Sequence, residues 1–181
     1  MEKLSLREIA AALGCPQPPE AEITRVITDS REAGEGALFI ALPGERVDGH
    51  DYINKALAAG AEAAVAERDG DYACPERVLR VGSSLRALLE ISALYRAKMP
   101  ARVVGITGSV GKTTTKEMTA AVMASSYRTI KTEGNQNNEI GAPKTLMTIT
   151  PETEVAVVEM GMSAPDEIKD LCYAAKPMMG I

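Results

Sequence analysis

The residues best suited to chemistry lie in the stretch GITGSVGKTTTKEM, residues 105–118. Its glycines let backbone amides approach an anion, because glycine has no Cβ in the way. The lysine adds a full positive charge for the β- and γ-phosphates of a nucleotide, and the first threonine offers Mg²⁺ a hydroxyl. We therefore predict a loop that binds ATP, formed by Gly108, Ser109, Val110, Gly111, Lys112, Thr113 and Thr114.

This loop is shorter than the common phosphate-binding pattern, which has a glycine where this chain has Ile106. Its context still supports the interpretation. An apolar run, ARVVGIT, precedes it and is typical of a parallel strand buried on both faces. A helix is predicted over residues 112–124, and a helix N-terminus attracts anions. The alternative, a glycine-rich turn with a chance Lys-Thr, explains less of this context.

A carboxylate for the metal is expected at the end of the next buried strand, EVAVVEM. Glu159 ends that strand, and ligands bind at the carboxyl ends of parallel strands. We predict that Thr113 and Glu159 serve Mg²⁺, directly or through water. A solvated strand-end acid is the alternative for Glu159. No Asn-Lys-x-Asp guanine signal occurs, which favours ATP over GTP.

An asparagine-rich loop, TEGNQNNEIGAPKTLM, follows another short strand, YRTIK. It contains Asn135, Asn137 and Asn138 together with two glycines. Turn chemistry alone explains such a composition, because asparagine tolerates the left-handed conformation and caps helices. Its place after a strand of the same sheet nevertheless puts the loop at the edge where ligands bind.

The remaining pattern places these segments in two α/β units. Residues 1–82 alternate short strands and helices, beginning with a helix for which Ser5 and Glu8 fit a capping box. Residues 83–100 read as a linker helix, and residues 101–181 as a parallel-sheet unit. Its last predicted helix, PDEIKDLCYAA, has Pro165 near the first turn. Since the chain stops in an apolar strand start, we expect the front part of a longer protein.

The composition excludes several function classes. Aromatic residues make up 3% of the chain and the net charge is −5, which argues against a nucleic-acid binder. No apolar run approaches the roughly 20 residues needed to span a membrane. The three cysteines are far apart in the sequence and have no metal-binding spacing. We expect a cytoplasmic protein with no membrane insertion, and a monomer.

Taken together, TGSVGKTT, GNQNNEIGAPKTLM and VVEMGMSAPDEI closely resemble the Mur ligases, the cytoplasmic ATP-dependent amino-acid ligases of bacterial cell-wall precursor synthesis. The front segment from Thr28 to Val65 looks like the uridine-nucleotide-binding domain of that family. The Asn-Asn-Glu-Ile-Gly and Lys-Glu-Met sequences look most like the members that add D-alanyl-D-alanine. The resemblance implies a small N-terminal α/β uridine-nucleotide-binding domain, followed by an incomplete P-loop-type parallel-sheet ATPase domain.

The resemblance also implies a reaction in peptidoglycan precursor synthesis. ATP would phosphorylate the terminal carboxylate of UDP-N-acetylmuramoyl-tripeptide, and the amine of D-alanyl-D-alanine would attack the acyl phosphate. By motif match, Lys112 and Asn138 would act at the reacting phosphate, and Asn137 would help to bind the substrate. The segment Asp29, Ser30 and Arg31 would lie at the uridine diphosphate, although a structural ion pair is the alternative for Asp29 and Arg31. His50 is expected to be a turn or helix-start residue.

The chain departs from the family in length. The resemblance implies a middle domain that continues further, with a histidine and a carbamylated lysine for a second metal, and then a third domain. We therefore expect this chain alone to be inactive. Alternatives are the diaminopimelate- or lysine-adding Mur ligase, a folylpolyglutamate or cyanophycin synthetase, a non-catalytic uridine-nucleotide-binding module, and a P-loop switch protein.

Overall fold

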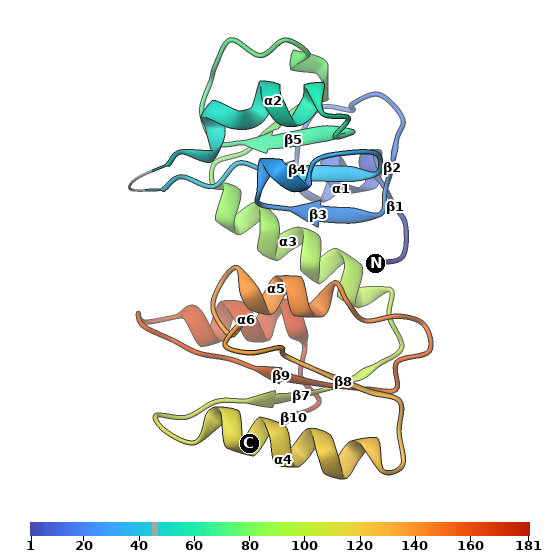
Figure 1. Cartoon of the computed structure of the whole chain (residues 1–181), viewed down its shortest axis with the longest axis vertical. Helices are drawn as coiled ribbons and strands as arrows, with labels where there is room; N and C mark the ends of the chain where they lie inside the picture. Colours follow the sequence, from blue (N-terminus) through green and yellow to red (C-terminus); the bar gives the residue numbers. More distant parts are fainter. Residues whose placement is uncertain (45–46) are drawn as a thin grey trace. The chain divides into compact units, whose positions relative to one another are not determined.

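The computed structural model describes residues 1–44 and 47–181 and divides into two compact units. The first unit is Met1–Ile91 and the second is Ser92–Ile181 (Figure 1). Helix α3 (Ser84–Ala97) belongs in part to each. The boundaries expected from the sequence, after residues 82 and 100, stay predictions. The expected α/β fold class is confirmed, because each unit has a four-stranded parallel sheet with helices.

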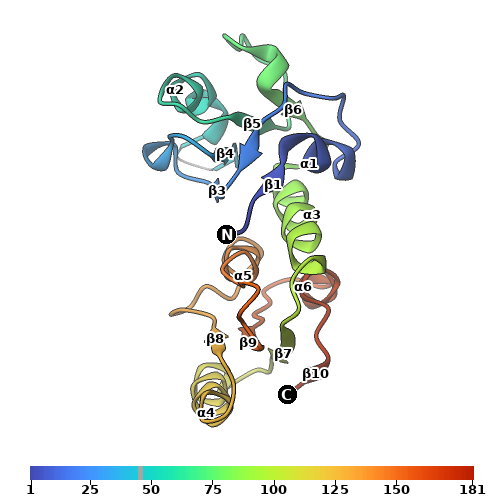
Figure 2. The same ribbon diagram turned by 90° about the vertical axis from the view of Figure 1, so that its right-hand side faces the viewer.

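The first unit is built on a parallel sheet whose strands follow one another in sequence order. Its strands are β3 (Arg25–Ile27), β4 (Ala37–Ile40), β5 (Ala63–Ala66) and β6 (Val78–Arg80). Helix α2 (Ile53–Ala58) covers one face, and α1 (Leu6–Ala12) and the start of α3 lie on the other (Figures 1 and 2). Short 3₁₀ helices, η1 (Ser30–Glu32), η2 (Gly49–Tyr52) and η3 (Pro75–Arg77), connect the strands.

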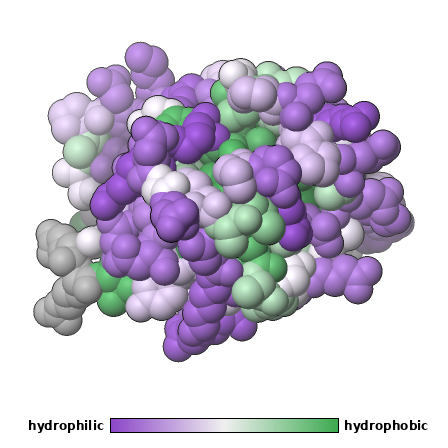
Figure 3. Space-filling view, turned by 90° about the horizontal axis from the view of Figure 1, so that it is seen from above, coloured by the Kyte–Doolittle hydropathy of each residue, from purple (hydrophilic) through white to green (hydrophobic). Residues whose placement is uncertain are grey.

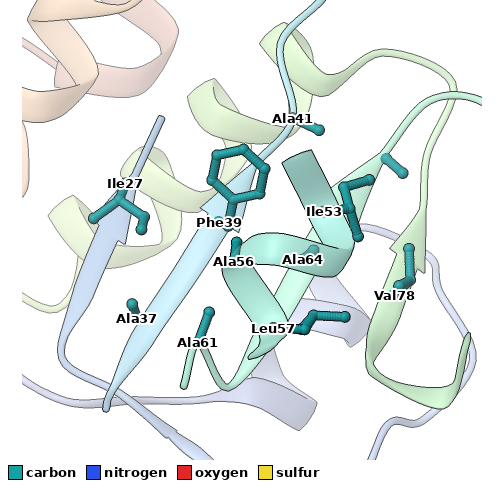
Figure 4. Packing of buried hydrophobic residues seen from close by; sticks show 11 residues of the cluster. Ile27, Ala37, Phe39, Ala41, Ile53, Ala56, Leu57, Ala61, Ala64 and Val78 are labelled. Carbon is teal, nitrogen blue, oxygen red and sulfur yellow. The ribbon is translucent and has the colours of Figure 1, made fainter. Parts of the chain in front are cut away.

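The core of this unit lies between α2 and the sheet (Figure 4). Phe39 on β4 is a large aromatic side chain of this core and is 1% exposed, and Tyr52 and Tyr72 pack against the same cluster. Ile53 and Ala56 of α2 pack in the same cluster, beside Ala64 of β5. Because so many of these side chains are small, the short helix can approach the strands closely.

The expected capping box at the first helix is wrong. Ser5 precedes α1 but its side chain makes no capping hydrogen bond. Instead, Ser5 belongs to strand β1 (Leu4–Ser5), which pairs antiparallel with β2 (Glu22–Ile23). Ser5 is therefore both the N-cap position of α1 and part of a strand pair, and its hydroxyl makes no capping bond.

The second unit has three layers around a second parallel sheet. The strand order is β10-β7-β9-β8, and the strands are β7 (Arg102–Ile106), β8 (Thr129–Lys131), β9 (Val155–Glu159) and β10 (Met179–Gly180). Helix α4 (Lys112–Ala124) covers one face, and α5 (Gly141–Leu146) and α6 (Glu167–Ala175) cover the other (Figure 2). Ala120 of α4 belongs to a core cluster with four strand residues: Val104, Ile106, Val155 and Val157.

Strand β7 occupies the position where the connections of this sheet change direction. The chain leaves β7 for β8 and β9 on one side and returns to β10 on the other. Open parallel sheets bind ligands outside the carboxyl ends of their strands at such a switch point. The loop after β7 is the predicted phosphate-binding loop, and the loops after β8 and β9 reach the same edge.

Helix α6 begins later than expected. Its first residue is Glu167, and Asp166 before it has a φ of 68° in the left-handed region. Pro165, the first residue of the expected helix, therefore lies just before α6 and still near its first turn. Ser163 closes this end, because its backbone amide donates to Glu167 Oε2 over 2.6 Å. This bond joins the segment before the helix to the first helical residue.

The surface is mixed in character. Hydrophilic residues dominate the face in Figure 3, with hydrophobic residues in small patches among them, as is usual for a protein surface. In the part of the chain that the structure describes, no helix has the length and apolarity to cross a membrane.

Candidate nucleotide and metal site

The loop after β7 has the backbone shape of an anion cradle. Gly108 has a φ of 140° and Gly111 a φ of 77°, conformations that favour glycine over any residue with a Cβ. Gly111 is also the N-cap of α4, so the free amides of this helix begin at the loop. Lys112 folds back over the loop and donates from Nζ to the carbonyl of Gly108 over 2.8 Å. Val110 at the loop tip is 89% exposed.

Glu159 lies against this loop, at the end of the neighbouring strand. Its side chain is 1% exposed. Its Oε1 accepts a hydrogen bond from Thr113 Oγ1 over 3.2 Å and another from Asn137 Nδ2 over 2.8 Å. Its backbone amide donates to Thr132 Oγ1 over 3.0 Å. The structure thus brings together side chains from the phosphate-binding loop, the asparagine loop and the end of β9.

The oxygens at this point suit a Mg²⁺ ion. Two neighbouring ligands of octahedral Mg²⁺, each at about 2.1 Å, lie about 3 Å apart, close to the 3.2 Å between Thr113 Oγ1 and Glu159 Oε1. Glu159 Oε2 is buried and accepts no hydrogen bond from the residues that the structure describes. Among residues 1–44 and 47–181, no group of three or more His, Cys, Asp or Glu could hold a metal unaided. That fits Mg²⁺ bound by few protein ligands and by phosphates.

The sequence interpretation missed one charged residue at this site. Lys116 lies one turn after Lys112 on α4, and its side chain is 0% exposed. Its Nζ is 3.3 Å from Glu159 Oε2, a charge contact without hydrogen-bond geometry, and donates to the carbonyl of Gly134 over 3.0 Å. Its four-residue spacing from Lys112, on the same side of the helix, was the available signal.

The asparagine loop uses its side chains in two different ways. Asn137 joins the loop to the end of β9. Its side-chain Nδ2 donates to Glu159, and its backbone carbonyl accepts from the backbone amide of Gly161 over 2.8 Å. Asn138 Oδ1 accepts from the backbone amides of Ile140 and Gly141, so it supports the start of α5. Burial raises the pKa of the neighbouring Glu139 carboxyl, and the charges of Glu167 and Asp170 raise it further.

The predicted substrate residues of the first unit line a separate pocket of about 650 Å³ at the carboxyl ends of β3 and β4. Asp29, Ser30 and Arg31 form one wall. Arg31 Nε donates to Asp29 Oδ1 over 2.9 Å, and Nη2 donates to Oδ2 over 2.5 Å. These bonds with Asp29 raise the pKa of the Arg31 guanidinium. The ion pair considered as an alternative therefore exists, and it lies within the pocket wall.

Two further pocket residues were missed from the sequence. Tyr52 and Lys55 lie at the start of α2 and face the same pocket as Asp29. The Lys55 ammonium is 5.8 Å from the centre of the Tyr52 ring, within cation–π range. Their spacing of three residues, which places side chains on one face of a helix, was the sequence signal that they lie together.

His50 is a buried structural residue, which confirms its expected place at a helix start. It lies in η2, 8% exposed, and its Nδ1 is 2.6 Å from Asp48 Oδ1. Its Nε2 accepts from the backbone amide of Glu67 over 3.0 Å, so Nδ1 carries the proton. Hydrogen bonds from the His50 backbone and ring lower the pKa of the Asp48 carboxyl, helped by the charge of Arg68.

Comparison with known families matches both units of the chain. The sequence pattern described as "Mur ligase family, catalytic domain" matches residues 22–108, and "Mur ligase middle domain" matches residues 106–181. The UDP-N-acetylmuramoyl-tripeptide--D-alanyl-D-alanine ligase of Bacillus subtilis is 42% identical over 98% of this chain and 40% of its own length. The Escherichia coli enzyme of the same name is 43% identical, over 84% of this chain and 33% of its own.

Solved structures match as well. A crystal structure of MurF from Acinetobacter baumannii has a TM-score of 0.88 and 34% identity, covering 99% of this chain and 40% of its own. The MurF ligase from Thermotoga maritima, in complex with ADP, has a TM-score of 0.78 and 38% identity, covering 84% of this chain and 35% of its own. The chain therefore spans about 40% of the length of several relatives that it matches.

Proposed function

The chain belongs to the Mur ligase family, and we propose that the protein to which it corresponds joins D-alanyl-D-alanine to UDP-N-acetylmuramoyl-tripeptide at the expense of ATP. The observation that carries the proposal is the contact of Thr113 with buried Glu159 beside a glycine loop at the switch point of a parallel sheet. That arrangement matches the needs of Mg·ATP, and the relatives' names supply the substrates.

The proposed chemistry requires positive charge at the transferring phosphoryl group. A carboxylate is a poor electrophile, so it is first phosphorylated, and the amine then displaces phosphate to form the peptide bond. Phosphoryl transfer depends mainly on positioning and electrostatic stabilisation. We assign this role to Lys112, which would exchange its bond to Gly108 for the phosphates, and to the amides of residues 108–114.

We assign the metal to Thr113 and Glu159. When bound, Mg²⁺ would neutralise phosphate charge and fix the orientation of the phosphoryl group. Glu159 is already oriented for this role by Thr113 and Asn137, so little rearrangement is needed. Asn137 thus acts through Glu159. For the proposed contact with substrate, its side-chain Nδ2 would have to donate to the substrate as well as to Glu159. The Oδ1 atom of Asn138 is used at the start of α5, so Asn138 would contact the reacting phosphate through Nδ2.

The pocket of the first unit is proposed to hold the uridine diphosphate part of the substrate. Its volume of about 650 Å³ falls in the range of small-molecule sites. Arg31 and Lys55 bring positive charge to its wall, and Ser30 adds a hydroxyl. The bidentate bond of Arg31 to Asp29 leaves less of the guanidinium for a phosphate. We therefore assign the diphosphate mainly to Lys55 and the Ser30 segment, with Arg31 holding the wall in place.

The test is product analysis with the complete protein. It is incubated with ATP, Mg²⁺ and UDP-N-acetylmuramoyl-tripeptide, and either D-alanyl-D-alanine or diaminopimelate is added; products are identified by mass spectrometry. We expect a UDP-linked pentapeptide with D-alanyl-D-alanine only. A parallel reaction contains the UDP-linked dipeptide in place of the tripeptide. Addition of diaminopimelate to that dipeptide would instead identify the alternative Mur ligase. Binding of the UDP-peptide without ATP turnover would support a non-catalytic module.

A further inference from the structure

Lys116 is a completely buried cation at the edge of the proposed metal site, and the phosphate-loop motif does not explain it. Its side chain is 0% exposed, although lysine is almost never fully buried unless it is paired. The phosphate-binding role already falls to Lys112, whose amino group lies at the loop itself. A buried ammonium must be stabilised by its neighbours, so these neighbours indicate what the residue does.

The neighbours of Lys116 come from three parts of the second unit. Its Nζ donates to the carbonyl of Gly134 in the asparagine loop over 3.0 Å and lies 3.3 Å from Glu159 Oε2. Glu117 Oε1 is 3.5 Å away, but the Glu117 side chain is 48% exposed and also pairs with Lys131. Because low polarity strengthens a charge pair, Glu159 is the main counter-charge of Lys116.

This pairing has a consequence for divalent cations. Mg²⁺ loses its water reluctantly and normally needs carboxylate or phosphate charge in return. The negative charge of the Glu159 carboxylate is already balanced by Lys116, so a free divalent cation gains little binding energy from it. The phosphates of a nucleotide would supply the missing negative charge, together with most of the ligands.

We infer that Lys116 is the built-in counter-ion of Glu159 and makes metal binding at this site conditional on nucleotide. It acts through Glu159, so it is a positioning residue that selects the metal–nucleotide complex over the free metal ion. The inference rests on the proposed function, because it takes Thr113 and Glu159 as the metal-binding pair. It predicts a gain of metal binding when the lysine charge is removed, which a purely structural lysine would not produce.

The test uses Mn²⁺ as the probe, and its binding is followed by electron paramagnetic resonance. The wild-type 181-residue chain should show no specific binding of free Mn²⁺, while calorimetry with Mn·ATP should show binding. Lys116→Met should bind free Mn²⁺ at least tenfold more tightly, which corresponds to about 1.4 kcal/mol. Lys116→Gln should show the same gain while keeping a donor near Gly134.

Two controls locate the gained site. Lys131→Met removes a lysine that pairs with Glu117 and makes no bond to Glu159, so it should not bind free Mn²⁺. Adding Glu159→Gln to Lys116→Met should abolish the gained affinity. Circular dichroism and the melting temperature show whether each variant is folded.

The outcomes separate the two proposals. Specific binding of free Mn²⁺ by the wild type would overturn the inference, and so would folded Lys116 variants that gain no affinity. If neither Lys116 variant folds, the wild-type titration decides. If the wild type binds neither free Mn²⁺ nor Mn·ATP, it is the proposed nucleotide site that fails.

Discussion

At the residue scale, Glu159 organises the candidate site more than any residue of the loop motif. Its carboxylate accepts hydrogen bonds from Thr113 and Asn137 and pairs with Lys116, and these residues come from two other segments of the sequence. Its place could be predicted from the sequence, because it ends an apolar strand at the edge where parallel sheets bind ligands. Lys116 could not be predicted as buried, since its burial depends on Gly134 and Glu159, which lie 18 and 43 positions further along the chain.

Asp48 provides a residue-scale prediction for the first unit. The His50 backbone and ring lower the pKa of its carboxyl, so the ionised form stabilises the fold. This contribution is complete above the unfolded pKa of about 3.9 and is lost as the pH falls through the lower, folded pKa. We therefore expect Asp48→Asn to be less stable than wild type at pH 5, with a difference that shrinks in stronger acid.

Urea unfolding from about pH 5 to about pH 2.5 measures this difference, across the window in which a carboxyl with a lowered pKa titrates. Asp69→Asn is the control, because the Asp69 side chain is 98% exposed and should change stability little. A difference between wild type and Asp48→Asn that stays constant or grows on acidification would contradict the assignment.

At the element scale, the sequence predicts most helices and strands of the second unit. Helix α4 has the predicted bounds, because Gly111 marks its start and no proline or glycine interrupts it. The failures were at helix starts, because Ser5 makes no side-chain capping bond and α6 begins at Glu167 rather than at Pro165. The fold class was accessible because hydrophobic patterns determine it, whereas exact helix ends depend on specific side-chain bonds.

Two glycines of the asparagine loop give an element-scale prediction. A Cβ at Gly141 would lie 2.5 Å from the Cα of Gln136, so the loop backbone would have to move. Gly134 has a φ of 54° with nothing near its Cβ position, so alanine there meets only conformational strain. We expect Gly141→Ala to lower the free energy of unfolding by about 1–3 kcal/mol. Gly134→Ala should cost about 1 kcal/mol.

Urea unfolding of both variants gives the free energies, and calorimetry with Mg·ATP gives the effect on the site. Only Gly141→Ala should also weaken Mg·ATP binding, because moving Gln136 moves Asn137 and, through it, Glu159. A Gly141→Ala variant as stable as wild type, or one with unchanged Mg·ATP affinity, would show that the loop does not hold the carboxylate.

At the scale of the whole molecule, the two units carry different candidate sites. The pocket beside Asp29 belongs to the first unit, and the Thr113–Glu159 contact belongs to the second. Each ligand should therefore stabilise its own unit. A ligand present at 100 times its dissociation constant stabilises the folded state by about 2.7 kcal/mol.

Hydrogen exchange followed by mass spectrometry tests this division. Mg·ATP should slow exchange in residues 105–124 and 155–161, and UDP-N-acetylmuramoyl-tripeptide should slow it around residues 28–44 and 47–55. If Mg·ATP, added without the UDP-peptide, slowed hydrogen exchange in the first unit, the assignment of the two sites to separate units would be contradicted.

We assign a Mg·ATP site to the loop after β7 together with Glu159, and calorimetry gives a direct test of this assignment. Mg·ATP is titrated into the wild-type chain and into Lys112→Ala, with and without UDP-N-acetylmuramoyl-tripeptide. Lys112 donates to the nearby carbonyl of Gly108, so the variant should keep the wild-type circular dichroism and melting temperature. We predict that the wild type binds and that the variant loses at least tenfold in affinity, about 1.4 kcal/mol. Equal affinity of the two folded proteins for Mg·ATP would contradict the account.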